Sequence, residues 1–370
     1  MRDILVALCG LTPQVVTETL WALNRRNPPI HPGEIRIITT ERGREVCLKS
    51  LLGPRGALVR YAREYRLGAK APRCGPDDVV VLRRANGALL EDVRTERDNQ
   101  AIADQIADLV RRQTERPETR IHCSVAGGRK TMGILLASAL QLYGRPDDRL
   151  YHVLVAPDFE ANQAFFYPPR RPRALVTAAG MRLDTRQADV ELAEVPYVRL
   201  RSLLPEKALT GRSRMTDLVV RAERELRAIT SPDPVVIEPA QSRLRIGEAT
   251  VRLTPAGIRL YTAFARIKTQ HCVEPQRKTC EECTACYVVV SPNTWAEARQ
   301  RLEVLAGGAL LSGQTTDAGT FRALVSKLNH ALRLALGSER VAARYAVRSA
   351  GERYAKTYGL AIDKGLIREP

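Results

Sequence analysis

Two turns that contain glycine carry side chains suited to holding a phosphate group. The first is Gly10-Leu11-Thr12-Pro13-Gln14, and the second is Gly127-Gly128-Arg129-Lys130-Thr131. Adjacent glycines let backbone amides come close to a phosphate, and the basic pair that follows supplies positive charge. Lys130 also opens a predicted helix, so its ammonium adds to the positive end of the helix dipole. Neither turn has the GxGxxG or the GxxxxGK[ST] spacing, so the residues predict neither a dinucleotide fingerprint nor a P-loop.

Each turn also has an ordinary structural interpretation. Thr12 is suited to the N-cap of a helix, and Pro13 is suited to its first position. Gly127 and Gly128 are suited to any tight turn that leads from a strand into a helix. The two turns therefore gain their meaning from where the fold places them.

The elements around the two turns are predicted to alternate between strand and helix. Helical patterns separate short apolar runs at residues 4–8, 35–39, 79–82, 121–124 and 150–155. Strands of continuous apolar residues between helices favour a mostly parallel sheet covered on both faces, which is a Rossmann-like α/β fold. Ligands bind such sheets at the carboxyl ends of the strands. Because the turns follow the first and fourth runs, we expect both at that edge.

Three stretches resemble the CRISPR-associated Rossmann-fold (CARF) family, and more narrowly its ring-nuclease branch. They are ILVALCGLTPQVVTETLWAL at 4–23, CSVAGGRKTMG at 123–133 and LQLYGRPDDRLYHVLV at 140–155, so the resemblance covers about the first 170 residues. It implies a homodimer that holds a cyclic oligoadenylate, usually cyclic tetra-adenylate, across its two-fold axis. It also implies cleavage that needs no metal or other cofactor. In that reaction the ribose 2′-OH attacks the adjacent phosphorus and leaves a 2′,3′-cyclic phosphate.

The same resemblance implies roles for particular residues. Lys130 and Thr12 are the expected catalytic residues, the first to neutralise charge on the phosphoryl oxygens and the second to orient ribose or phosphate. Ring nucleases often have Ser where Thr12 stands, so the hydroxyl is kept and a methyl group is added. Asn99 is equally suited to capping the helix that follows it. The expected ligand-binding residues are Leu11, Pro13, Gln14, Thr39, Thr40, Arg94, Asn99, Gly127, Gly128, Arg129 and Thr131.

A cluster of four cysteines has spacing typical of a metal site. Cys272, Cys280, Cys283 and Cys286 form two overlapping CxxC units after a longer first gap, with His271 as a substitute ligand. Thiolates at such spacing can converge on one tetrahedral zinc. Four protein ligands would leave no open position, so we expect the zinc to support folding and not catalysis. Reduced surface thiols and a redox pair are the alternatives.

The domain organisation is predicted from changes in pattern. Residues 1–202 form the CARF domain, residues 203–234 form a linker, and residues 235–370 form a second domain that contains the cysteine cluster at 272–286. A hairpin, three helices and a closing hairpin favour a winged helix-turn-helix in the second domain. Its basic residues, Arg322 and Lys327 among them, are suited to lying along duplex DNA. Winged helices also serve as dimerisation or protein-contact modules.

The overall charge favours a polyanionic partner. The 370 residues include 58 Lys and Arg against 41 Asp and Glu, a net charge of +17. A basic protein of this kind is suited to nucleotides or nucleic acid, although free use of arginine on solvated faces gives the same number. We expect no secretory signal, no membrane span and a cytoplasmic location. Two alternative functions remain open: a DNA-binding regulator gated by cyclic oligoadenylate, and a sensor that recruits a partner without cleaving the messenger.

Overall fold

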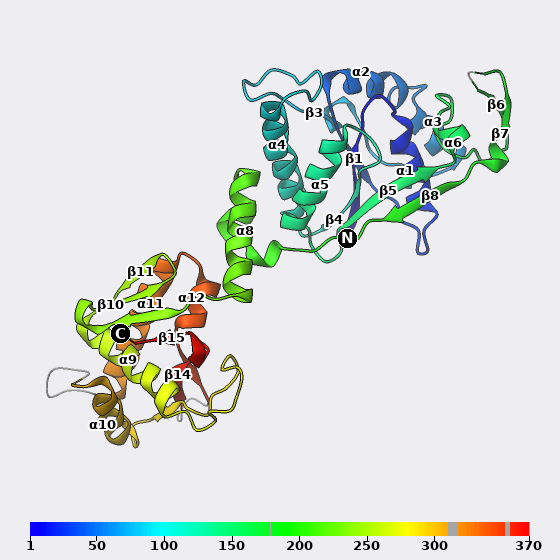
Figure 1. Ribbon diagram of the computed structural model, residues 1–370. Coiled ribbons are helices and arrows are strands. Elements are labelled where there is room, and N and C mark those ends of the chain that lie inside the picture. The colour runs from blue at the N-terminus through cyan, green and yellow to red at the C-terminus, as the bar shows by residue number, and fades with distance from the viewer. Residues whose placement is uncertain (178, 310–316, 352–355, 370) are drawn as a thin grey trace. The chain divides into compact units, whose positions relative to one another are not determined.

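The chain divides into two compact units, Met1–Ala222 and Glu223–Pro370, in the computed structural model (Figure 1). Residues 1–177, 179–309, 317–351 and 356–369 are described. Within those ranges, every helix is too short or too polar to cross a membrane. Each unit has its own hydrophobic core.

The first unit is built on a six-stranded sheet in the order β3-β2-β1-β4-β5-β8. The strands β1 to β5 run parallel, and β8 pairs antiparallel with β5. Their bounds are β1 (Arg2–Leu8), β2 (Glu34–Thr39), β3 (Val79–Val81), β4 (Thr119–Ser124), β5 (Arg149–Val155) and β8 (Val190–Glu194). The predicted mostly parallel Rossmann-like sheet is confirmed. A short hairpin, β6 (Ala174–Val176) with β7 (Arg182–Asp184), stands apart from it.

The central strand β1 is buried on both faces. Successive side chains of a strand point to opposite sides, so Ile4 and Val6 join one core while Leu5 and Ala7 join the other. All four have no exposed surface. This is why the strand reads as an unbroken apolar run in the sequence.

Helices cover both faces of the sheet (Figure 1). On one face lie α4 (Glu96–Thr114) and α5 (Lys130–Tyr143), whose apolar residues share a core with Ile4 and Val6. On the other lie α1 (Gln14–Asn24), α2 (Glu41–Ser50) and α3 (Ala57–Glu64), and the short α6 (Pro157–Glu160) follows β5. The result is a helix–sheet–helix sandwich, with the carboxyl ends of the parallel strands at one edge.

The predicted linker at residues 203–234 differs from the structure. Much of it packs on the first unit, through α7 (Glu206–Thr210) and the beginning of α8 (Met215–Thr230). The backbone N–H of Met215 donates to Asp104 of α4 at 2.8 Å. The Pro, Arg and Ser residues of this stretch suggested a linker, but its apolar residues join the same core as residues of α4 and α5: Leu204, Ala208, Met215, Leu218 and Ala222.

The second unit contains two small sheets. One has the order β11-β10-β9-β15, and the other has the order β12-β14-β13. The strand bounds are β9 (Val235–Glu238), β10 (Arg243–Ile246), β11 (Ala249–Arg252), β12 (Val288–Val290), β13 (Val347–Ala350), β14 (Lys356–Leu360) and β15 (Ile367–Arg368). Its helices are α9 (Pro255–Gln270), α10 (Trp295–Ala306), α11 (Ala318–Leu336) and α12 (Glu339–Tyr345).

The two predicted hairpins of this unit are confirmed. β10 and β11 form the first, and β13 and β14 form the closing one. After the first hairpin, Thr254 caps α9 by accepting a hydrogen bond from the Gly257 amide at 3.0 Å, and Pro255 takes the first helical position. The winged-helix assignment itself stays a prediction.

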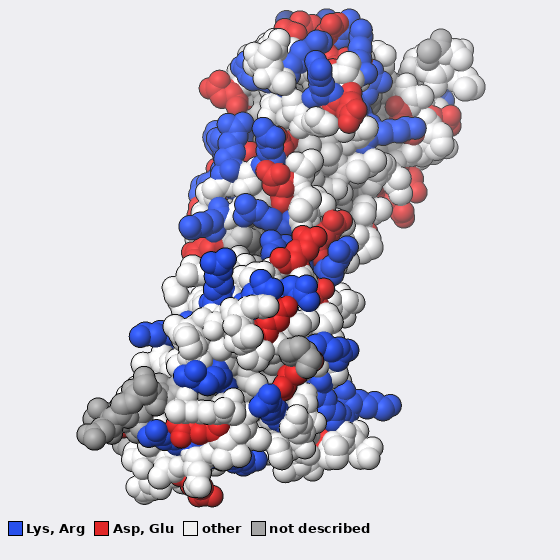
Figure 2. Space-filling model, turned by 60° about the vertical axis from the view of Figure 1, so that its left-hand side comes forward, with Lys and Arg blue, Asp and Glu red and all other residues white. Residues whose placement is uncertain are grey.

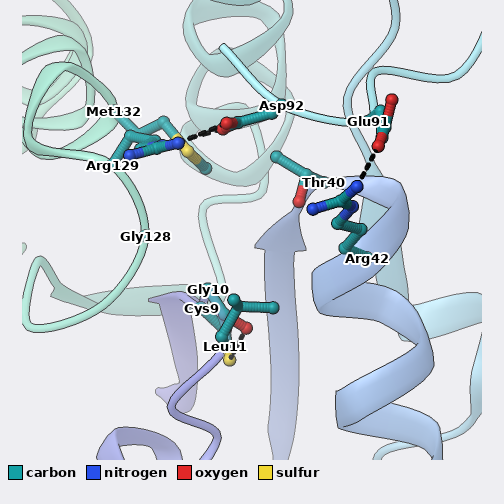
Figure 3. A pocket seen from close by; sticks show the side chains of 10 residues that line it. All are labelled: Cys9, Gly10, Leu11, Thr40, Arg42, Glu91, Asp92, Gly128, Arg129 and Met132. Carbon is teal, nitrogen blue, oxygen red and sulfur yellow. Dashed lines mark hydrogen bonds and ion pairs between the residues drawn. The ribbon is translucent and has the colours of Figure 1, made fainter.

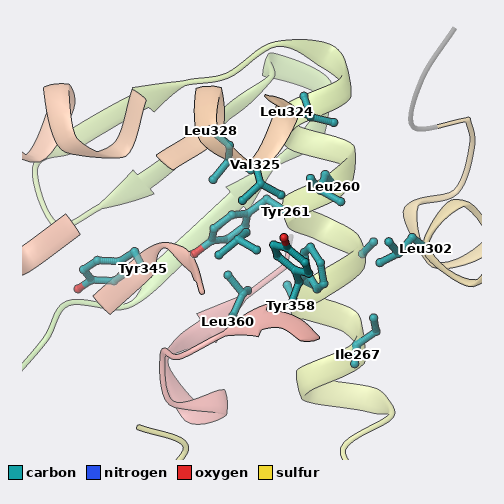
Figure 4. Close-up of a cluster of buried hydrophobic side chains, with 14 of the residues drawn as sticks. Leu260, Tyr261, Ile267, Leu302, Leu324, Val325, Leu328, Tyr345, Tyr358 and Leu360 are labelled. Carbon is teal, nitrogen blue, oxygen red and sulfur yellow. The ribbon is translucent and has the colours of Figure 1, made fainter. Parts of the chain in front are cut away.

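Aromatic and branched side chains fill the core of the second unit (Figure 4). Tyr261 of α9 has no exposed surface, and Phe321 of α11 meets Tyr358 of β14 edge to face, with ring centroids 5.0 Å apart. The ammonium of Lys268 is also buried and donates to the Leu360 carbonyl. A core this well filled explains why the helices and hairpins on either side of the cysteine segment form one compact unit.

Candidate ligand-binding site

The two glycine turns meet at the carboxyl edge of the first sheet. β1 and β4 are parallel neighbours, with Ala7 opposite Ser124, so the turns that follow them leave the sheet side by side. A Cβ atom added at Gly10 would lie 3.3 Å from both the N and the Cα atoms of Gly128. One added at Gly127 would lie 2.5 Å from the Leu8 carbonyl oxygen, closer than real Cβ atoms approach. The predicted meeting of the turns is confirmed, and glycine is what lets the two backbones touch.

The backbone amides of these turns have no internal acceptors. None of the amides at residues 10–12 or 127–131 donates a hydrogen bond to a residue that the structure describes. Gly128 adopts a φ of +79°, which turns the chain into α5, and that helix starts without a side-chain cap. Unpaired amides at a helix N-terminus attract anions. We call residues 10–12 and 127–131 the anion cradle.

Two functional groups of the cradle are free. The Lys130 side chain is exposed on the first turn of α5, and within the described chain it has no hydrogen bond or ion pair. The Thr12 hydroxyl is likewise exposed and has no described partner. The prediction that Thr12 caps α1 is wrong, because α1 begins at Gln14 with Pro13 in the cap position and no side-chain cap bond.

A hollow of about 270 Å³ opens on the α2 side of the cradle, and we call it the arginine hollow (Figure 3). Arg129 points into it and binds Asp92, with Nε donating to Oδ1 at 2.7 Å and Nη2 donating to Oδ2. The Arg129 guanidinium lowers the pKa of Asp92 to about 2. Arg42 of α2 forms a similar pair with Glu91. Both arginines are thus already neutralised by acids from the loop between β3 and α4.

The surface charge of the chain is mixed. On the face drawn in Figure 2, Lys and Arg side chains are interspersed with Asp and Glu. On that face the net charge of +17 does not gather into one basic patch. At the cradle itself, the groups available to attract an anion are the backbone amides and Lys130, which has no ion pair among the described residues.

Other predicted binding residues lie around the cradle in different ways. Leu11 lines the hollows on both sides of it and is 67% exposed. Thr40 lines the arginine hollow and caps α2 through the Gly43 amide. Thr131 is exposed next to Lys130. The Nε atom of Arg94 lies 3.6 Å from Oδ2 of Asp92, so Arg94 also pairs with this acid.

Three predicted residues point elsewhere. Thr39 is fully buried and packs against Gly43. A Cβ atom added at Gly43 would lie only 2.0 Å from the Thr39 hydroxyl oxygen. The Gln14 amide donates to the Gln163 carbonyl at 2.9 Å. Asn99 lines a separate hollow beside Arg214 and Met215, and the helix cap at this place is Thr95. These side chains do not reach the cradle. Pro13 is buried at the start of α1.

Sequence reasoning missed a second hollow of about 250 Å³ on the α1 side of the cradle. We call it the glutamate hollow because Glu18 of α1 lines it, together with Thr12, Gly127, His152 and Glu160. Glu18 is only 4% exposed, and burial with the nearby Glu160 carboxylate raises its pKa to about 8. Glu18 comes three residues after Val15, so the helical pattern places this acid on the buried apolar face of α1. That unusual position is the sequence signal that could have revealed the glutamate hollow.

The comparison with protein families decides where the chain belongs. A model of the CRISPR-associated protein NE0113 family matches residues 12–227, more than half of the 370 residues. The chain belongs to this family. The match includes both turns of the cradle apart from Gly10 and Leu11.

Comparisons with individual proteins add little to the NE0113 assignment. A solved structure of Enterococcus italicus Csm6 bound to cyclic hexa-2′-fluoro-hexa-dAMP matches with 16% identity and a TM-score of 0.26. The match covers 42% of this NE0113-family chain and 34% of the Csm6 chain. No curated protein matches the chain.

The cysteines of this NE0113-family protein are near one another but do not form a ligand set. Cys280, Cys283 and Cys286 are buried, and burial together with the nearby Cys272, Cys283 and Cys280 thiols raises the pKa of Cys286. Among the described residues, which include His271, no three His, Cys, Asp or Glu side chains are placed to hold a metal ion. The side chains as placed therefore do not fit a zinc ion, and the structural zinc stays a prediction.

Proposed function

We propose that this NE0113-family protein binds a cyclic oligoadenylate at the anion cradle and cleaves it to linear products, which ends type III CRISPR signalling. The observation that carries the proposal is the contact between the two turns. It brings together the turn amides, the Lys130 ammonium and the Thr12 hydroxyl, none of which has a hydrogen-bond partner among the described residues. A phosphate group needs these donors, and a phosphodiester of the messenger supplies the acceptors.

The proposed reaction is an internal transesterification. The ribose 2′-oxygen attacks the adjacent phosphorus, the bond from phosphorus to the 5′-oxygen breaks, and a 2′,3′-cyclic phosphate remains. The 2′-OH proton passes to water, and the departing 5′-oxygen takes up a proton. Negative charge grows on the phosphoryl oxygens, so fixed amides and Lys130 stabilise the transition state more than the bound ring. Thr12 holds the ribose or phosphate in line for attack.

The symmetry of the ring supports a homodimer as the active form. Each chain carries one cradle of a few residues, whereas a cyclic tetra-adenylate repeats its phosphates around a ring. Two cradles related by a two-fold axis present equivalent donors to opposite phosphates. We therefore propose that two copies of this chain share one ring.

The decisive experiment is product analysis without metal. Purified protein is incubated with labelled cyclic tetra-adenylate in excess EDTA, and the products are separated by chromatography and weighed by mass spectrometry. The proposal predicts linear adenylates that end in a 2′,3′-cyclic phosphate. Intact ring after prolonged incubation, in protein shown to bind it, would reject cleavage and leave a sensor.

A second candidate function is a DNA-binding regulator gated by the messenger. Arg322 and Lys327 are exposed on α11, and neither has an ion pair within the described chain. Free cations along one helix are suited to DNA phosphates. Retention of duplex DNA that depends on cyclic tetra-adenylate, and that Arg322→Ala with Lys327→Ala abolishes, supports this role. The same assay without DNA retention favours an adaptor.

A further inference from the structure

The glutamate hollow contains a buried acid with no partner. The Glu18 carboxyl lines the hollow at 4% exposure, and it forms no hydrogen bond or ion pair with any residue that the structure describes. His152 also lines the hollow, and its buried Nδ1 has no hydrogen-bond partner among the described residues. Buried polar groups are normally satisfied, and those that are not often face a ligand. An acid that lines a hollow without a described partner indicates that a polar group completes the hollow.

Apolar side chains form one part of the wall of the hollow. Val15 and Val153 are almost fully buried, and Leu154 and Val155 complete the β5 side. A flat ring with a polar edge can pack against these side chains while its edge meets the acid. The hollow shares Thr12 and Gly127 with the anion cradle, so a group bound here is next to a phosphate bound there.

We infer that the glutamate hollow is a base pocket in which the carboxyl of Glu18 reads the amino edge of one adenine of the bound messenger. This inference rests on the proposed binding of a cyclic oligoadenylate and adds the residue that selects its base. A protonated carboxyl donates its O–H to a ring nitrogen of adenine and accepts a hydrogen bond from the 6-amino group. An ionised carboxylate can only accept, so it leaves the ring nitrogen unsatisfied.

The surroundings of Glu18 favour the protonated form. Burial is the larger cause of its raised pKa, and repulsion from Glu160 on α6 is the second. Among the residues that line the hollow, the titratable ones are Glu18, His152 of β5 and Glu160, and no Lys or Arg is present to stabilise a carboxylate. A pKa of about 8 keeps the acid neutral at physiological pH.

The test uses a ring that cannot be cleaved. The probe is cyclic tetra-2′-deoxyadenylate, which lacks the attacking hydroxyl, and its matched analogue has purine in place of every adenine and so lacks the 6-amino group. Removal of that group should weaken binding to the unaltered protein by about fivefold or more. Glu18→Ala should bind both rings with the same, weaker affinity. Glu18→Gln, which keeps one donor and one acceptor, should still prefer the adenylate.

The pH dependence separates recognition from a merely structural role. Affinity of the unaltered protein for the adenylate ring should fall above about pH 8, where Glu18 ionises. Glu18→Gln should bind equally well from pH 6.5 to pH 9. Glu160→Gln removes the repelling charge, so its affinity should begin to fall at a lower pH.

Each outcome bears on the inference. If the adenylate ring binds and Glu18→Ala keeps the full preference for the 6-amino group, the base pocket is rejected while the proposed function stands. A fall in affinity above pH 8 that persists unchanged in Glu18→Gln rejects it equally. If neither ring binds any variant at the highest concentration tested, the proposed function fails and the base pocket fails with it.

Discussion

Gly10 and Gly128 touch backbone to backbone, because a Cβ atom on Gly10 would lie 3.3 Å from the N and Cα atoms of Gly128. The two residues are 118 positions apart in the chain, and the parallel pairing of β1 with β4 brings them together. The amides of residues 10–12 and 127–131 have no acceptor among the described residues. The proposed activity depends on this arrangement.

A methyl group at Gly127 should disturb the cradle. In Gly127→Ala the new atom would lie 2.5 Å from the Leu8 carbonyl oxygen, so the turn must move. We expect affinity for cyclic tetra-2′-deoxyadenylate to fall about tenfold or more. The free energy of unfolding should fall by about 1–3 kcal/mol, the usual cost of overpacking. Calorimetric titration and chemical denaturation measure the two effects.

The matched control is Gly133→Ala in α5. Its nearest new contact is Val125 Cβ at 3.6 Å, and alanine favours a helix interior by up to about 1 kcal/mol. This variant should bind as the unaltered protein does. Equal binding by Gly127→Ala and Gly133→Ala would show that the position of the turn does not matter for the ligand.

Release of Arg129 from Asp92 should strengthen binding. Asp92→Asn removes the charge that now neutralises this guanidinium, so a ligand phosphate no longer competes with a carboxylate. We expect the dissociation constant to fall about two- to fivefold, the scale of an exposed ion pair. Because the pKa of Asp92 is about 2, mild acid cannot reproduce the effect. Asp184→Asn breaks a similar pair with Arg186 away from the cradle and should change nothing.

The buried Glu18 should make the stability of the first unit depend on pH. Its pKa of about 8 in the fold is above the usual 4.5, so between these values the folded state holds a proton that the unfolded state has released. Stability should therefore fall as the pH rises from about 4.5 to about 8, by up to about 1.4 kcal/mol per pH unit. Denaturation at pH 5.5 and pH 8 measures this slope.

Two variants check the origin of that slope. Glu18→Gln cannot titrate and should gain stability relative to the unaltered protein as the pH rises. In Glu160→Gln the slope should end at a lower pH, because the repelling carboxylate is gone. A slope that is identical in Glu18→Gln would assign the pH dependence to another group.

The Thr12 hydroxyl should matter for the rate and not for the fold. Thr12 is exposed and caps no helix, so Thr12→Val should leave the melting temperature unchanged. We expect its rate of ring opening to fall about tenfold, within the usual effect of a lost positioning contact. Thr12→Ser keeps the hydroxyl and should stay within about twofold. Full activity in Thr12→Val would remove this residue from the mechanism.

The sequence was most informative where local pattern determines structure. Short, mainly apolar runs that lead to a glycine turn predicted β1, β4 and the turns after them, because a central parallel strand is buried on both faces. The free hydroxyl of Thr12 was harder to foresee, since Thr-Pro is a common start for a helix. Here α1 begins one residue later than that pattern indicates.

Contacts of individual side chains with distant segments were not predictable from local pattern. The burial of Glu18 depends on β5 and α6, which are more than 130 positions away in the chain, and Asp92 reaches Arg129 from the loop before α4. Asn99 was expected near the ligand, but the turn of α4 directs it to a different hollow. Residues 203–222 resembled a linker in composition, yet Leu218 is fully buried in the core that includes residues of α4 and α5.

The proposed cleavage is tested most sharply by the single-turnover rate at which Lys130→Ala opens cyclic tetra-adenylate in EDTA. We predict that this rate falls well over tenfold while the ring still binds, because the ammonium acts mainly on charge that develops in the transition state. Lys49→Ala, which removes an exposed lysine from α2, is the matched control and should react at the normal rate. A Lys130→Ala protein that opens the ring as fast as the Lys49→Ala control would contradict the account.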